Sequence, residues 1–98
     1  MKIVKTQEET KLTIALEGRL DTMTAPELDQ ELKGSLEGIQ ELVVDMARLE
    51  YVSSAGLRVL LSAQKVMNKQ GEMVVKNVSE QIMEVFEVTG FTDILNIQ

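Results

Sequence analysis

The chain alternates short apolar runs with longer segments of helical periodicity, and this alternation constrains its fold more than any other feature. The runs at 39–46 and 73–75 are typical of buried strands, and the amphipathic segments at 25–36 and 54–69 are typical of helices. When strands and helices alternate in this way, the strands lie parallel and right-handed crossovers join them. The sequence therefore predicts an α/β fold built on a mostly parallel sheet.

Two shorter segments near the N-terminus add an antiparallel edge to this sheet. Residues 3–6 and 12–16 have the length and composition of strands, and a polar turn separates them. Leu12, Ile14 and Leu16 alternate with Lys, Thr and Ala, which is the period-2 pattern of a half-buried strand. The predicted order is strand, strand, helix, strand, helix, strand, helix, with four strands in one mixed sheet.

Glycines and capping residues mark the expected ends of these elements. Gly18 breaks the second strand, and residues 47–52 are expected to form a loop before the second helix. Thr24 is placed to cap the first helix and Ser79 the third, because such side chains accept hydrogen bonds from free backbone N–H groups. Gly90 ends the third helix, and the tail at 91–97 is apolar enough to pack against the body.

Composition limits the classes of function that are open to the chain. Its 98 residues suit one domain, and aromatic residues supply only 3%, so the core must be aliphatic. The net charge of −6 argues against nucleic acid and against an anionic membrane surface as partners. The N-terminus does not resemble a signal peptide, and no apolar run has the ~20 residues that span a bilayer. We therefore expect a cytoplasmic protein.

The chain contains no cysteine and no histidine. This excludes zinc sites made of thiolates or imidazoles, cysteine nucleophiles and Ser–His catalytic pairs. Neither a glycine-rich phosphate cradle nor a nucleophile elbow is present. The sequence favours a binding protein over an enzyme, and it predicts no cofactor.

The segment that begins the second helix is the most informative for function. Ser53 and Ser54 precede the small residues Ala55 and Gly56. By position alone Ser54 is expected to cap the helix, yet a helix N-terminus also accommodates a phosphate, because its N–H groups are free and its dipole is positive there. Ala55 and Gly56 would leave room for the backbone of a partner.

Two carboxylates lie at predicted strand ends. Asp21 follows the second strand, and Asp45 ends the third. Each is expected to bond a neighbouring turn or loop. If both lay near Ser54 they could bind a metal or a phosphoryl donor, but two scattered carboxylates are a poor metal signature, so no metal site is predicted.

These motifs resemble those of a known family. The stretches at 18–21, 43–45 and 51–61 are similar to those of STAS domains, and the resemblance extends over nearly the whole chain, as a single STAS domain at 1–98. STAS domains occur in bacterial anti-sigma factor antagonists and in sulfate transporters. The resemblance implies a protein that binds an anti-sigma factor with serine kinase activity and so releases a sigma factor.

The resemblance also implies how such binding is controlled. The anti-sigma factor uses ATP to phosphorylate one serine of the antagonist, which breaks the complex, and a phosphatase restores it. The motif places that serine at Ser54, with Ser53 as a second candidate, and Asp21 matches an acidic residue of the family near it. Ser53 stands where the best-known members have Asp.

The predicted partner face comprises Asp21, Thr22, Met23, Ser53, Ala55, Gly56 and Arg58. The alternative is a STAS scaffold subunit of a transport or lipid-trafficking complex, without a switch.

Overall fold

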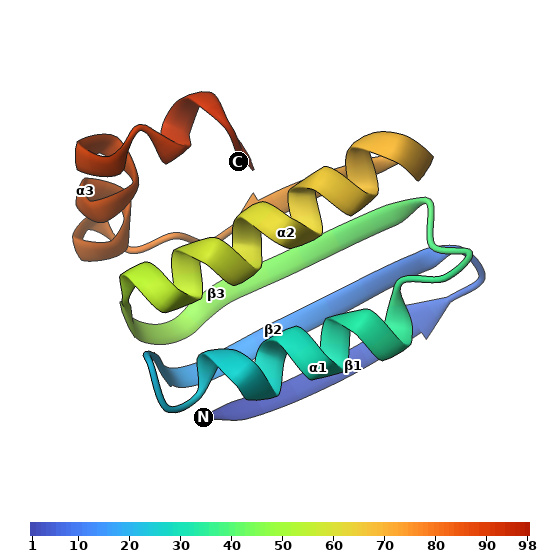
Figure 1. Cartoon of the computed structure of the whole chain (residues 1–98), viewed down its shortest axis with the longest axis horizontal. Helices are drawn as coiled ribbons and strands as arrows, with labels where there is room; N and C mark the ends of the chain where they lie inside the picture. The colour runs from blue at the N-terminus through green and yellow to red at the C-terminus, as the bar shows by residue number, and fades with distance from the viewer.

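The computed structural model describes residues 1–98, which form one mixed sheet and three α-helices (Figure 1). The elements are β1 Lys2–Glu8, β2 Lys11–Leu20, α1 Ala25–Ser35, β3 Glu41–Val52, α2 Ser54–Gln70, β4 Glu72–Lys76, α3 Glu80–Thr89, the short 3-10 helix η1 Phe91–Asp93 and β5 Asn96–Ile97. The strands lie side by side in sequence order. β1 runs antiparallel to β2, and every other neighbouring pair is parallel. The predicted α/β class and antiparallel edge are confirmed.

The sheet has five strands instead of the predicted four. The additional strand, β5, contains only two residues, which pair with β4. Such a short segment shows no periodicity, so only its contact with β4 identifies it as a strand. The tail does pack against the body as expected, because Leu95 is buried in the core.

β2 and β3 are both longer than their sequence patterns indicated. The predicted loop at 47–52 is wrong, because β3 continues to Val52 and buries Leu49 on the way. Gly18 does not end β2 either; it lies inside the strand with a φ of 101°. The register between the two strands shifts on both sides of this glycine. These irregularities interrupt the alternation of apolar and polar residues, which is why the pattern indicated a loop.

One hydrophobic core joins the helices to a single face of the sheet. Leu12, Ile14 and Leu16 point into it from β2, and α3 contributes Ile82 and Phe86. In Figure 1, α1 and α2 lie next to one another across the sheet, and both helices contribute buried leucines to the core. No helix is long and apolar enough to cross a membrane.

Candidate functional site

The carboxyl ends of β2 and β3 meet at one edge of the sheet. Leu20 pairs with Val52 in the parallel ladder, and the backbone N–H of Ser53 donates to the carbonyl oxygen of Leu20 at 2.8 Å. The chain then turns into α1 after β2 and into α2 after β3. The segments that follow β2 and β3 therefore converge at this edge.

Ser53, and not Ser54, caps α2. The Ser53 backbone is extended, with φ −97° and ψ 173°, and its Oγ accepts a hydrogen bond from the N–H of Gly56 at 3.3 Å. Ser54 is the first residue of the helix, and its side chain is exposed. The prediction that Ser54 is the cap was wrong by one residue, since the cap must lie outside the helical backbone. The Ser54 hydroxyl has no structural hydrogen bond in this arrangement.

The first turn of α2 carries no negative charge. It contains no acidic residue, in contrast to α1 and α3, which have Glu27 and Glu80 there. The whole helix has Arg58, Lys65 and Lys69 but no carboxylate. The helix dipole adds partial positive charge at Ser54. The electrostatic environment of the Ser54 hydroxyl therefore favours a group that gains negative charge.

Gly56 packs against β2 in the interior of the protein. It is buried, and a Cβ on it would lie 2.6 Å from the Cγ and 3.1 Å from the carbonyl oxygen of Leu20. The interpretation that Gly56 leaves room for a partner backbone is wrong, because Leu20 occupies that side. The glycine instead lets α2 approach β2 closely, which fixes the position of Ser54. Ala55, which is half-buried, keeps some exposed surface beside it.

Asp21 holds the turn that leads into α1. Its Oδ1 accepts from the backbone N–H groups of Met23 and Thr24 at 3.0 and 3.1 Å. Thr24 is the N-cap residue of α1, as expected, but its side chain makes no capping bond, and its Oγ1 donates to the Arg19 carbonyl at 2.7 Å instead. Partial burial alone would raise the pKa of Asp21. The hydrogen bonds from Thr24 and Met23, together with the charge of Arg19, outweigh burial and hold that pKa below its ordinary value.

Arg19 and Tyr51 complete this edge, and sequence reasoning missed both. The Arg19 guanidinium lies 4.3 Å from the centre of the Tyr51 ring, and its Nε lies 3.8 Å from Oδ2 of Asp21. The two residues face one another in the β2–β3 register. A Tyr in one strand and an Arg in the next could have suggested the contact only if the bulged register had been known.

The remaining residues of the predicted partner face lie on the surface around Ser54. Thr22, Met23 and Arg58 are all exposed, and Met23 is 87% exposed. A large apolar side chain with that exposure makes no contribution to the core. The structure thus places Thr22, Met23, Ser54 and Arg58 where another protein can reach them.

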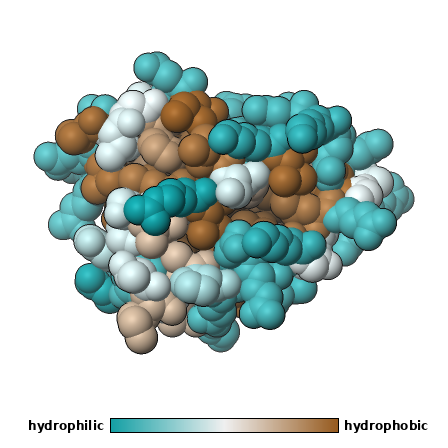
Figure 2. Space-filling model, in the orientation of Figure 1, coloured by the Kyte–Doolittle hydropathy of each residue, from teal (hydrophilic) through white to brown (hydrophobic).

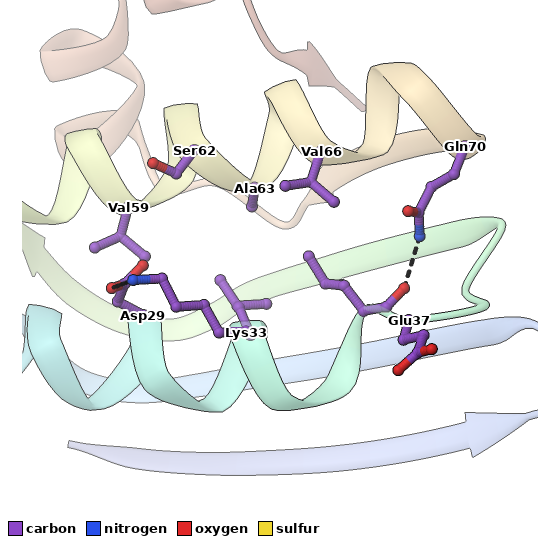
Figure 3. A pocket seen from close by; sticks show the side chains of 10 residues that line it. Asp29, Lys33, Glu37, Val59, Ser62, Ala63, Val66 and Gln70 are labelled. Carbon is purple, nitrogen blue, oxygen red and sulfur yellow. Dashed lines mark hydrogen bonds and ion pairs between the residues drawn. The ribbon is translucent and has the colours of Figure 1, made fainter.

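A groove of about 280 Å³ runs between α1 and α2 and ends near this face (Figure 3). Apolar surface shows between the two helices, crossed by hydrophilic side chains (Figure 2). Lys33 pairs with Asp29 along α1 at 3.0 Å, and at the far end Gln70 donates to the Leu36 carbonyl at 2.6 Å. A second hollow of about 330 Å³ continues from the groove to the first turns of both helices, where Arg58 lines it.

Asp45 does not belong to this site. It lies in the middle of the sheet, between Ala15 of β2 and Lys76 of β4, seven residues before Val52 and therefore roughly 20 Å from it along the strand. Its Oδ1 accepts from the side chain of Asn77 and the N–H of Ala47, both at 3.0 Å. The hydrogen bond from Asn77, followed by that from Ala47, holds the pKa of Asp45 below its ordinary value. Asp21 and Asp45 thus cannot share a metal or a phosphoryl donor.

The chain is similar to proteins of one family. The family described as "Mlab, STAS domain" matches residues 3–96. BtrV of Bordetella bronchiseptica, named provisionally as an anti-sigma factor antagonist, is 36% identical over 99 residues, which cover 99% of this chain and 85% of that protein. The anti-sigma-B factor antagonist of Bacillus subtilis is 30% identical over 92 residues, which cover 93% of this chain and 84% of that protein. Neither name is that of an enzyme, which agrees with the expectation of a binding protein.

The fold is also similar to that of solved structures. The Bacillus cell fate determinant SpoIIAA, in its phosphorylated form, superposes with a TM-score of 0.77 at 16% identity, over 99% of this chain and 91% of that chain. At this level of identity the likeness concerns the fold alone. The expected STAS-like arrangement is thereby confirmed.

Proposed function

The chain belongs to the STAS domain family, and we propose that it acts as an anti-sigma factor antagonist that phosphorylation of Ser54 switches off. The relatives with this name supply the class of function. The observation that carries the switch is local: Ser53 caps α2, which leaves the hydroxyl of Ser54 exposed and without a structural hydrogen bond. A modification there costs no native contact.

In the unmodified state, the protein binds an anti-sigma factor and so releases the sigma factor. The binding face comprises the exposed residues around the β2 and β3 ends, with Met23 as its most exposed apolar side chain. Exposed apolar groups at the centre of a small polar surface are typical of interface anchors. This proposal places the protein in the cytoplasm, where sigma factors work.

The switch itself is a phosphoryl transfer that the partner catalyses. The Ser54 oxygen forms a bond to the γ-phosphorus of ATP, the bond to the β-phosphate oxygen breaks, and ADP leaves. The hydroxyl proton passes to a base of the kinase. A phosphatase reverses the change by transferring the phosphoryl group to water. This chain contributes the nucleophilic hydroxyl and its exposed position, and the partner supplies the catalytic groups.

Phosphate on Ser54 changes the charge of the binding face without unfolding it. It adds roughly −1.5 to −2 charges at a helix N-terminus, where negative charge stabilises the helix. Asp21 already carries a carboxylate on the adjoining turn, because it directly follows Leu20, whose carbonyl oxygen accepts the N–H of Ser53 at the start of α2. The partner must then desolvate two negative groups in place of one, so the complex weakens.

The test is to incubate the protein with the anti-sigma factor of its own organism and ATP, and to map the modified residue by mass spectrometry. Phosphate at Ser54 supports the proposal. Phosphate at Ser53 would move the switch to the capping residue, and an unmodified protein would refute the switch. Ser54→Ala is the matched control, since it removes the hydroxyl and leaves the cap at Ser53 intact.

The alternative is a STAS scaffold that binds its partner constitutively. Ser54→Asp separates the two functions, because it adds negative charge at an exposed position without a kinase. The switch predicts weaker binding of Ser54→Asp than of Ser54→Ala. A scaffold predicts equal binding of both variants.

A further inference from the structure

Arg58 is an exposed cation on α2 that has no carboxylate partner. It takes part in none of the five ion pairs of the structure, whereas Arg19, Arg48, Lys5, Lys11 and Lys33 each pair with an acidic residue. The nearest element across the hollow is α1, and its Asp29 is already bound to Lys33 at 3.0 Å. The guanidinium is therefore available to a new anion.

Arg58 lies four residues after Ser54 in the same helix. Residues at this spacing are neighbours on the helix surface, with Cβ atoms about 5–6 Å apart. Side chains of a helix also tilt toward its N-terminus, so the Arg58 side chain can reach the turn that carries Ser54. An acidic group that precedes its basic partner by four residues is the more favourable orientation of such a pair.

We propose that Arg58 binds the phosphate of phosphorylated Ser54 within the same helix, and that this pairing removes Arg58 from the surface offered to the partner. The inference rests on the proposed function and deepens it, because it identifies the residue that responds to the phosphate. The planar guanidinium can donate two parallel hydrogen bonds to phosphate oxygens. No other cation of α2 can replace it, since Lys65 is eleven residues from Ser54, about 16 Å along the helix.

The pairing gives phosphorylation a second effect on binding. In the unmodified protein, Arg58 lines the hollow at the first turns of α1 and α2, beside the predicted partner face. After phosphorylation, the same side chain is held over the first turn of α2 instead. The partner then meets an added negative charge and loses a positive one. The switch is therefore larger than the phosphate charge alone would make it.

The test uses the full chain with phosphoserine incorporated at position 54 by genetic code expansion, so that it requires no kinase. The second pKa of the phosphate, about 6 in an unstructured peptide, is followed by ³¹P NMR across the titration. The charged groups on the neighbouring segments are Arg19 near the end of β2, Asp21 on the turn after it, Glu50 near the end of β3 and Asp29 on α1. None of these is changed in the comparison.

Arg58→Gln and Lys65→Gln are the matched variants, because each removes one positive charge from an exposed position of α2. A direct ion pair stabilises the dianion, so Arg58→Gln should raise the phosphate pKa by about 0.3 unit, and Lys65→Gln should leave it unchanged. Arg58→Lys should restore part of the shift. Equal pKa values in the Arg58→Gln and wild-type phosphoproteins, or equal shifts in both Gln variants, would overturn the pairing.

The outcome is separate from that of the proposed function. If the kinase modifies Ser54 but Arg58→Gln leaves the phosphate pKa unchanged, the proposed switch is supported and the pairing is refuted. If the pKa responds to Arg58 but no kinase modifies Ser54, the pairing describes the geometry of the helix and the proposed switch falls.

Discussion

Gly56 of α2 lies against Leu20 of β2 so closely that a Cβ on the glycine would be 2.6 Å from the Leu20 Cγ. Both residues are buried, and the Leu20 carbonyl also accepts the N–H of Ser53 at 2.8 Å. One residue at the end of β2 thus holds both the cap and the first turn of α2. The position of Ser54 depends on this contact.

Gly56→Ala is expected to destabilise the protein by about 1–3 kcal/mol, because the added methyl group forces Leu20 or the helix to move. Urea denaturation measures the change. Gly34→Ala is the matched control, since Gly34 lies in α1 with nothing within 4 Å of its Cβ position. That variant should gain about 0.5–1 kcal/mol from helix propensity. Equal stability of the Gly56→Ala variant and the wild type would contradict the close contact.

Alanine substitutions at the two serines at the start of α2 should have different effects on the free energy of unfolding. Ser53→Ala removes the cap and is expected to cost about 1 kcal/mol, whereas Ser54→Ala should change the free energy of unfolding very little. Ser79→Ala provides a reference, because Ser79 caps α3 through the same bond length of 3.3 Å. A larger loss for Ser54→Ala than for Ser53→Ala would show that the cap is assigned to the wrong residue.

The Asp45–Asn77 hydrogen bond predicts a pH dependence of stability. Because the pKa of Asp45 is lowered in the folded state, its contribution is present above the unfolded pKa of about 3.9 and is lost as the pH falls through the folded value. Asn77→Gly removes the side-chain bond, so the pKa of Asp45, followed by NMR, should rise toward its ordinary value. An unchanged pKa would refute the contribution of Asn77.

Substitutions at Asn77 also test the left-handed backbone conformation of this residue. Asn77 has a φ of 60°, a region that glycine adopts freely and alanine does not. Both variants lose the bond to Asp45, but Asn77→Ala should be less stable than Asn77→Gly by about 1 kcal/mol. Thermal denaturation of the pair at neutral pH measures this difference, and equal midpoints would contradict it.

Asp21 combines a turn with a charge, and one substitution separates the two. Asn at position 21 can still accept from the N–H groups of Met23 and Thr24, but it carries no charge. At neutral pH we expect Asp21→Asn to keep most of the wild-type free energy of unfolding. Asp21→Ala should be less stable than Asp21→Asn, because alanine cannot accept from these two N–H groups. Because the lowered pKa of Asp21 contributes stability that disappears as the pH falls through its folded value, Asp21→Asn should be less sensitive to acid. Urea midpoints at pH 7 and pH 3 test both statements.

Local signals predicted the parts of the fold that depend on neighbouring residues. Ser79 caps α3 and Gly90, at φ 80°, ends it, both as expected, because a capping bond spans only three residues. The predicted cap of α2 missed by one position, since the choice between Ser53 and Ser54 depends on where the backbone becomes extended. Neighbouring side chains do not indicate at which of the two serines the backbone changes from extended to helical.

Long-range pairing explains what the sequence could not reveal. The second half of β3 is polar at Arg48 and Glu50 and is a strand only because β2 pairs with it through a shifted register. The same shift places Arg19 opposite Tyr51, so their contact was invisible to a periodic pattern. The burial of Gly56 against Leu20 also joins residues distant in sequence.

The central claim is that phosphate on Ser54 switches partner binding off, and calorimetric titration of the anti-sigma factor with the two forms of the protein tests it. The unmodified protein should bind, and the Ser54 phosphoprotein should bind roughly a hundredfold more weakly, a difference of about 3 kcal/mol. Equal affinities of the two forms would contradict the account.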